Sequence, residues 1–167
     1  SAAAYIQRFG SLIRAYETVG FTPDRDYRFL EVNKFLRKLH PEIVGSTESA
    51  ILDLGGTVER DPATDLINVN REFTISIVIA RCQTPESGRH RWKIRFDTSL
   101  APDITIAVRL DQANQRPLDY YLLPYLDFGS SRVSLAEHNG VEFESYRFDD
   151  LHYLYGMAQR ARIKRAA

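Results

Sequence analysis

The sequence has only one cysteine, Cys82, in 167 residues, and only one tryptophan and one methionine. A single cysteine excludes a disulfide framework and any zinc site made from several thiolates. A lone thiol fits a reducing compartment. We therefore expect a cytoplasmic protein, of bacterial type.

A net charge and long apolar runs are also absent. The 22 basic and 22 acidic residues cancel, so the molecule as a whole does not steer toward nucleic acid or an anionic membrane. No apolar run approaches the roughly 18 residues of a membrane-spanning helix, so we expect no membrane partner. The sequence has no glycine-rich phosphate loop, GxSxG or HExxH pattern, which leaves nucleotide-cofactor, hydrolase-triad and zinc-protease interpretations without support.

The chain has enough residues for one domain, 1–167, with two lobes at 1–70 and 71–167 as the alternative. Apolar residues at three- and four-residue steps predict helices over 3–19, 28–39 and 41–54, the last beginning at Pro41, and a final helix over 148–165. About six strands lie between them. This order predicts an α+β fold: an N-terminal three-helix layer, a mainly antiparallel sheet and a C-terminal helix.

A hairpin follows the predicted helices. The runs TVER (57–60) and DLINVN (65–70) flank Asp61-Pro62-Ala63-Thr64, which is rich in turn-forming residues. Three helices and a hairpin are the element order of a winged helix, a DNA-binding motif. The alternative is a helical layer that packs on the sheet.

Three β-type runs in the middle of the chain each carry an aspartate near one end. They read RWKIRFD (91–97), PDITIAVRLD (102–111) and LDYYLLP (118–124), and their aspartates are Asp97, Asp103 and Asp119. If these strands were neighbours in one sheet, the three carboxylates would meet at its rim. Clustered carboxylates hold Mg²⁺ in metal-dependent phosphodiesterases. The alternatives are a strand-start cap for Asp103 and solvated strand ends for the other two.

The stretch 91–124 resembles the core of restriction-endonuclease-like (PD-D/E-x-K) nucleases. That family has an antiparallel strand, a second strand opening with Pro-Asp and a third carrying an acid-x-Lys triplet. Here Pro102-Asp103 matches the Pro-Asp element, whereas Asp119-Tyr120-Tyr121 has a tyrosine where lysine is expected. The resemblance implies that Asp103, with Asp97 or Asp119, holds Mg²⁺, and that Lys93 positions the attacking water.

Basic residues flank this acidic centre. Arg91, Lys93 and Arg95 alternate with apolar residues, so they share one side of their strand, and Arg89 comes just before them. Their spacing of about 7 Å is close to that of phosphates along a DNA strand. The sequence therefore predicts a phosphate-binding row here. The alternative is pairing with acids on neighbouring strands, such as Asp97 or Asp111.

Two helices carry further basic sets. The first set is on the predicted second helix and is either a DNA-contacting or a solvated face: Arg28, Lys34, Arg37 and Lys38. The second set complements the negative end of the final helix, or touches phosphate or a partner chain: Arg160, Arg162, Lys164 and Arg165. The final helix also has an apolar stripe that could dock on a second copy and form a homodimer.

These observations predict a nucleic-acid-associated domain that binds DNA, with a degenerate or Mg²⁺-dependent nuclease-like core. If the protein is an enzyme, it is a DNA endonuclease, and Mg²⁺ is the cofactor that cleavage would need. The alternative is a protein-interaction or dimerisation domain of a larger assembly. Salt separates the two, because phosphate contacts weaken steeply with salt and apolar interfaces do not.

Overall fold

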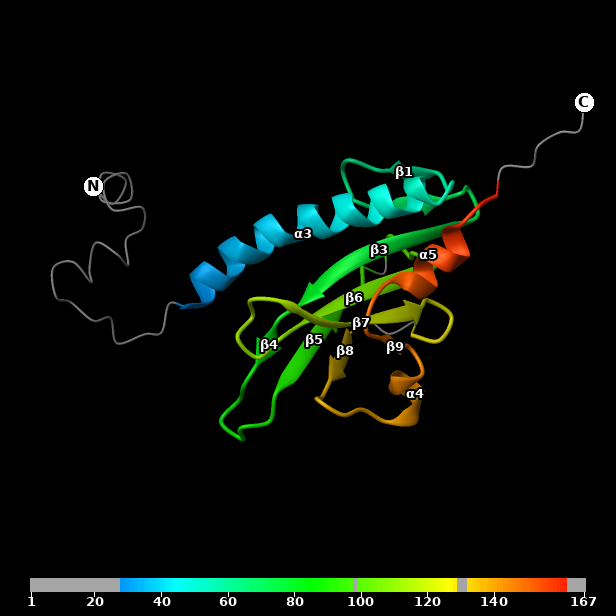
Figure 1. The fold of residues 1–167 in the computed structure, drawn as a ribbon. Coiled ribbons are helices and arrows are strands. Elements are labelled where there is room, and N and C mark those ends of the chain that lie inside the picture. The colour runs from blue at the N-terminus through cyan, green and yellow to red at the C-terminus, as the bar shows by residue number, and fades with distance from the viewer. Residues whose placement is uncertain (1–27, 98, 129–131, 162–167) are drawn as a thin grey trace, which may run out of the picture. The chain divides into compact units, whose positions relative to one another are not determined.

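The computed structural model describes residues 28–97, 99–128 and 132–161 (Figure 1). The elements are, in chain order, α3 (Arg28–Asp53), β1 (Val58–Arg60), β2 (Ile67–Val69), β3 (Phe73–Ala80), β4 (Cys82–Gln83), β5 (Arg91–Arg95), β6 (Ile104–Leu110), β7 (Pro117–Pro124), β8 (Arg132–Leu135), α4 (Val141–Glu144), β9 (Arg147–Phe148) and α5 (His152–Ala158). The predicted α+β class is confirmed. The helix predicted over 3–19 lies outside the described residues.

The chain divides into two compact units, Ser1–Lys38 and Leu39–Ala167, with the boundary inside α3. In the first unit the structure describes only the beginning of α3. Both sheets, α5 and the rest of α3 belong to the second unit. No helix in the described ranges is long and apolar enough to cross a membrane.

A six-stranded sheet in the order β1-β2-β3-β6-β7-β9 forms the centre of the second unit. Four of its strand pairs are antiparallel, and one, β3 with β6, is parallel, with Ile75 opposite Ile104. The mainly antiparallel sheet of about six strands is therefore confirmed. A simple meander from residue 72 onward is not formed, because a parallel pair needs a crossover connection and the chain leaves the sheet between β3 and β6.

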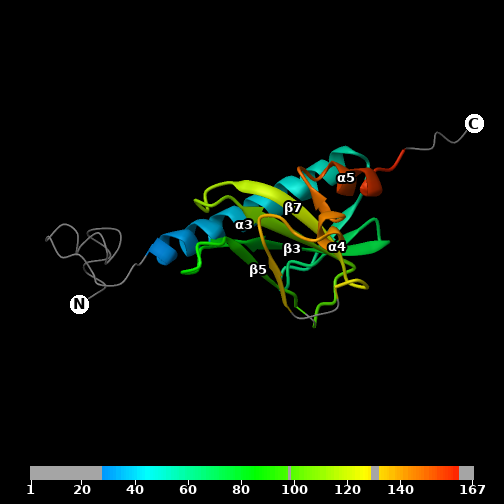
Figure 2. The same cartoon turned by 90° about the horizontal axis from the view of Figure 1, so that it is seen from below.

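The crossover itself contributes to a second sheet of three antiparallel strands, in the order β4-β5-β8. β5, which the nuclease resemblance would place beside the Pro-Asp strand, lies here and not next to β6. Residues of both sheets form one apolar cluster around Trp92, Ala107 and Tyr121. The small sheet therefore covers one face of the large one, with β5 and α3 on different sides in Figure 2.

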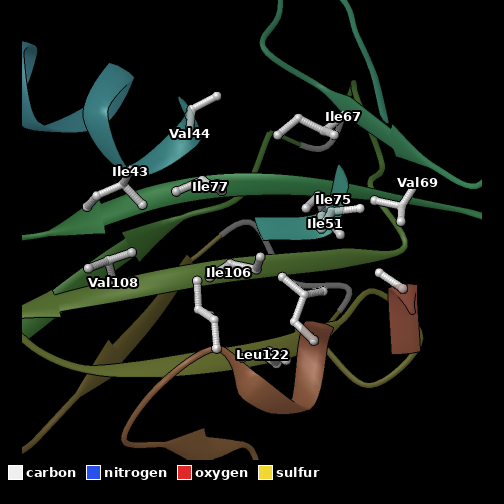
Figure 3. Close-up of a cluster of buried hydrophobic side chains, with 13 residues drawn as sticks. Ile43, Val44, Ile51, Ile67, Val69, Ile75, Ile77, Ile106, Val108 and Leu122 are labelled. Carbon is white, nitrogen blue, oxygen red and sulfur yellow. The ribbon is translucent and has the colours of Figure 1, made fainter. Parts of the chain in front are cut away.

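Helices cover the other face of the large sheet. Ile43, Val44 and Ile51 of α3 pack on β2, β3 and β6 (Figure 3). Leu151 and Leu154, from the α5 region, belong to the same apolar cluster. The central strands alternate between the two apolar clusters: Ile106 faces the helices and Ala107 faces the small sheet. Burial of both faces explains why β3, β6 and β7 read as nearly continuous apolar runs.

The separate helices predicted at 28–39 and 41–54 are one continuous helix, so the three-helix prediction is wrong for this part of the chain. Pro41 lies inside α3. Proline lacks an N–H and crowds the preceding turn, which favours a break. Here, however, Ile43 and Val44 on the following turn are anchored in the core, and burial of that face outweighs the local penalty.

The end of α3 and the hairpin after it agree with the sequence prediction. Gly55 has a φ of +84°, and a Cβ there would lie 2.4 Å from the carbonyl oxygen of Arg160. Only glycine fits this left-handed, crowded position at a helix end. β1 and β2 then form the predicted antiparallel hairpin, in which the Asp61 carboxylate accepts a hydrogen bond from Ala63 N at 2.8 Å.

The predicted C-terminal helix over 148–165 is wrong in extent. β9 takes up the beginning of that range and α5 ends at Ala158, after which Gln159 has an extended ψ of 135°. The apolar stripe that was expected to dock on a second copy is directed inward, because Leu154 and Ala158 are fully buried in the core.

Candidate functional site

The predicted basic row is present on β5. Trp92 and Ile94 are buried against the large sheet, whereas Lys93 and Arg95 are exposed and Arg91 is half-buried. This alternation follows from the two-residue period of a strand whose inner face is covered. The row therefore lies on the outer side of the small sheet.

The neighbouring strands extend this surface. Lys93 lies opposite Ser134 of β8, Arg95 lies opposite Arg132, and on the other edge Arg91 lies opposite Gln83 of β4. We call these outward side chains the basic face: Gln83, Arg91, Lys93, Arg95, Arg132 and Ser134. Arg95 and Arg132 are directly opposite each other, so two cations are neighbours at this end of the face.

Carboxylates do not neutralise the basic row. Among the described residues, Arg91, Lys93 and Arg95 make no ion pair. Arg91 donates one hydrogen bond, to the carbonyl oxygen of His90 at 3.0 Å. The pairing alternative, with Asp97 or Asp111, is therefore not what the structure shows.

Asp97, the acid that follows the row, is bonded within its own turn. Its carboxylate accepts hydrogen bonds from the Ser99 hydroxyl at 2.5 Å and the Ser99 N–H at 2.9 Å. These bonds hold the pKa of Asp97 below its ordinary value. This local pattern corresponds to the solvated strand end weighed as the alternative.

The remaining predicted nucleic-acid contacts lie on a loop and on α3. Arg89 is exposed in the loop before β5. Lys34, Arg37 and Lys38 are exposed along one side of α3 in the first unit, without an ion pair among the described residues. Arg28 is the first residue of α3, and its side chain lies outside what the structure describes.

Strand register separates Asp103 from Asp119. Asp103 precedes the first residue of β6, whereas Asp119 of β7 lies opposite Arg109 near the other end of β6. Six residues at about 3.3 Å each put them about 20 Å apart along the strand. Lys93 points outward from the other sheet. Across the described ranges, no group of three or more His, Cys, Asp or Glu side chains could hold a metal ion.

Asp103 ties together the starts of the two parallel strands. Its carboxylate accepts hydrogen bonds from the N–H of Thr74 at 2.7 Å and from the Thr74 hydroxyl at 3.0 Å. The Asp103 N–H donates in return to the Thr74 hydroxyl at 3.0 Å. These contacts correspond to the strand-start cap that was the alternative to metal binding.

Asp119 is part of a buried ion pair that the sequence analysis did not anticipate. Arg109 and Asp119 are each 3 % exposed, and Arg109 donates two hydrogen bonds to the carboxylate, at 2.8 and 2.5 Å. Burial alone would lower the pKa of Arg109, but the hydrogen bonds and charge of Asp119 raise it. An arginine inside an otherwise apolar strand, ITIAVRL, was the sequence signal for this pair.

Arg109 also connects the two sheets. Its guanidinium lies over the ring of Trp92 on β5, 4.5 Å from the centroid, and donates a hydrogen bond to the carbonyl oxygen of Ala136, just after β8. The Trp92 indole N–H donates to the carbonyl oxygen of Leu110 at 2.7 Å. Because Arg109 is buried and its charge is paired with Asp119, we interpret it as a structural cation.

Comparison with known proteins assigns this chain to no family. No protein-family model matches the sequence, and no curated protein matches it either. Among solved structures, the fold is similar to that of a bacterial homing endonuclease, I-Ssp6803I, with 16% sequence identity, a TM-score of 0.42, and coverage of 72% of this chain and 92% of that one. This likeness is too loose to carry a function across.

Proposed function

We propose that this domain binds nucleic acid through the basic face of its three-stranded sheet. The observation that carries the proposal is the row of Lys93 and Arg95, exposed on β5 without a carboxylate partner among the described residues. Cations kept apart from acids, in a protein whose net charge is zero, suit an anionic partner from outside the chain.

The spacing of the face supports a phosphate backbone as that partner. Residues two apart on a strand are about 7 Å apart, close to successive phosphates of one nucleic-acid strand. Gln83 and Ser134 lie across from Arg91 and Lys93 and add neutral hydrogen-bond donors of the kind that contact phosphate oxygens. Arg132 lies opposite Arg95 on β8 and adds a further cation to the basic face.

We also include two sets of exposed cations outside the small sheet among the proposed nucleic-acid contacts. Arg89 precedes β5 on a loop, and Lys34, Arg37 and Lys38 form a basic set on α3. Their contribution is separable, because each set can be neutralised without touching the sheet. The proposal concerns binding; cleavage would require metal ligands, and strand register keeps Asp103 and Asp119 apart.

The test measures binding of labelled duplex DNA as a function of salt. Each phosphate contact contributes about −0.9 to the slope of log K against log salt. Replacing Lys93 and Arg95 together by glutamine should therefore reduce the slope by about 1.8. The Arg116→Gln variant is the matched control, because Arg116 is exposed on the β6–β7 loop and off the basic face.

The outcomes are distinct. An unchanged slope in the double variant would sink the proposal for the sheet, and a reduced slope in the combined Lys34, Arg37 and Lys38 variant would move the interface to α3. No binding of DNA by the wild type at low salt would overturn the proposal and favour a protein-interaction domain, the alternative function.

A further inference from the structure

A pocket of about 550 Å³ lies on the inner side of the small sheet, away from the basic face. Its floor contains Trp92 and Arg109, and Leu118 of β7 forms an apolar wall. The polar part of its lining includes Asp111, Glu137 and His138. The volume falls within the range of small-molecule sites, about 300 to 1,000 Å³.

The charges around this pocket are unbalanced toward the negative. Its one arginine, Arg109, is already neutralised by the bidentate bond with Asp119. The carboxylates of Asp111 and Glu137 have no such partner: in the described ranges neither forms an ion pair with a lysine or arginine.

Each of these two carboxylates uses only one oxygen. One oxygen of Asp111 accepts hydrogen bonds from the N–H groups of Gln115 and Arg116, at 2.9 and 3.4 Å. One oxygen of Glu137 accepts from the Gln112 side chain at 3.0 Å and lies 3.7 Å from a ring nitrogen of His90. Within the described residues, the second oxygen of each makes no hydrogen bond and remains available as an acceptor.

The same charges affect the pKa of the buried Cys82 thiol, which lies opposite Trp92 on the neighbouring strand. Burial raises the pKa of Cys82 above its ordinary 9.0, and the negative charges of Glu137 and Asp111 raise it further. A hydrogen bond with Thr84 and the positive charge of Arg109 act in the opposite direction. Burial is the largest of these effects, and the two carboxylates add to it in the direction expected for nearby negative charge.

We propose that this pocket binds a small organic cation, an ammonium or guanidinium group on an apolar stem. The stem would pack on Leu118 and the floor, and the head would donate to Asp111 and Glu137. Anions are repelled by the two carboxylates, and a neutral ligand forgoes the charge-assisted hydrogen bonds. The pocket and the basic face have opposite charge, so this proposal does not rest on nucleic-acid binding.

The experiment uses Trp92 as reporter, since it is the only tryptophan of the chain and lies in the floor of the pocket. Phenethylammonium, 2-phenylethanol and 3-phenylpropionate are matched probes that differ in head-group charge. We expect saturable fluorescence quenching by the ammonium, affinity for the alcohol at least about tenfold weaker, and none for the carboxylate. A capped tripeptide with a central arginine distinguishes a protein side chain from a free amine as the source of the cation.

Variants locate the binding. Glu137→Gln keeps the shape and the hydrogen bond from Gln112, and should weaken phenethylammonium binding about tenfold. Glu86→Gln removes an acid from an exposed loop position outside the pocket and should change nothing. Equal affinity for ammonium and alcohol, no saturable quenching, or equal loss in both variants would each overturn the proposal.

Discussion

Arg109 and Arg95 are both strand arginines of the same unit, and they show two ways of placing a cation on a sheet. Arg109 is 3 % exposed and meets a carboxylate, a carbonyl oxygen and an indole ring. Arg95 is exposed on the outer face, opposite another arginine and without an acid. The first stabilises the contact between the two sheets, and the second leaves charge for a partner.

The roles of the acidic residues were harder to predict from the sequence than those of the basic residues. Carboxylates hold a metal ion only where several of them converge. Asp119 is paired with Arg109, and strand register puts Asp103 about 20 Å away from it. The basic row, in contrast, stands on one strand, so its geometry needs no knowledge of which strands are neighbours.

The largest effect is expected from breaking the buried pair. Asp119→Ala leaves the Arg109 guanidinium buried without its carboxylate, which should lower the free energy of unfolding by about 3 to 5 kcal/mol. Urea denaturation measures this. Glu59→Ala breaks the exposed ion pair with Arg71 and is the matched control, with an expected change within about 0.5 kcal/mol.

The double variant Arg109→Met, Asp119→Leu sharpens the same test. Replacing a buried ion pair by apolar residues of similar size is often neutral, so much of the lost stability should return. If Asp119→Ala is as mild as Glu59→Ala, the pair is effectively solvated and the contrast with Arg95 disappears.

A smaller effect is expected at the start of the parallel strands. Asp103→Ala removes the acceptor for two hydrogen bonds from Thr74, at an exposed position, and should destabilise the fold by about 1 kcal/mol. Asp103→Asn keeps an acceptor and should lose less. If Mg²⁺ raises the melting temperature of the wild type and not of Asp103→Asn, the residue is a metal ligand after all.

Changing Arg95 should have the opposite sign. Arg95→Glu replaces a like-charge pair with Arg132 by an opposite-charge pair, and should stabilise the sheet by about 0.2 to 1 kcal/mol. The same change should weaken DNA binding, because it removes a phosphate ligand and adds a repulsive charge. A loss of stability would show that Arg95 has a structural role like that of Arg109.

Local patterns in the sequence were enough for some of these features. The alternation of Arg91, Lys93 and Arg95 with Trp92 and Ile94 predicted the basic row on β5, since one strand defines it. The hairpin and the end of α3 followed from turn residues such as Gly55.

What sequence could not provide was the pairing of distant strands. Nothing local indicates that β5 joins β8 in a second sheet, or that Arg109 lies opposite Asp119. The continuous α3 was missed for a related reason, because burial of Ile43 and Val44 decides whether Pro41 breaks the helix. Helix α5 is shorter than its apolar pattern because β9 uses part of it to extend the large sheet.

The smallest effect is expected at Tyr120, whose partly buried phenol packs against the helix-covered apolar cluster. Burial raises the pKa of the Tyr120 phenol above its ordinary 10.0, and the charge of Asp150 adds to this. The folded protein then keeps the proton that the unfolded chain releases, so this contribution is complete below pH 10 and is lost as the pH rises through the folded pKa. Urea titrations at pH 8 and at a pH above 10 give the loss in free energy of unfolding over this range. We expect a smaller loss for Tyr120→Phe than for the wild type. Tyr153→Phe, at a residue that is 60 % exposed, should behave as the wild type. An identical pH dependence for all three proteins would show that the Tyr120 phenol is hydrated in the folded state, in contrast to the 3 % exposed Arg109 on the other face of the sheet.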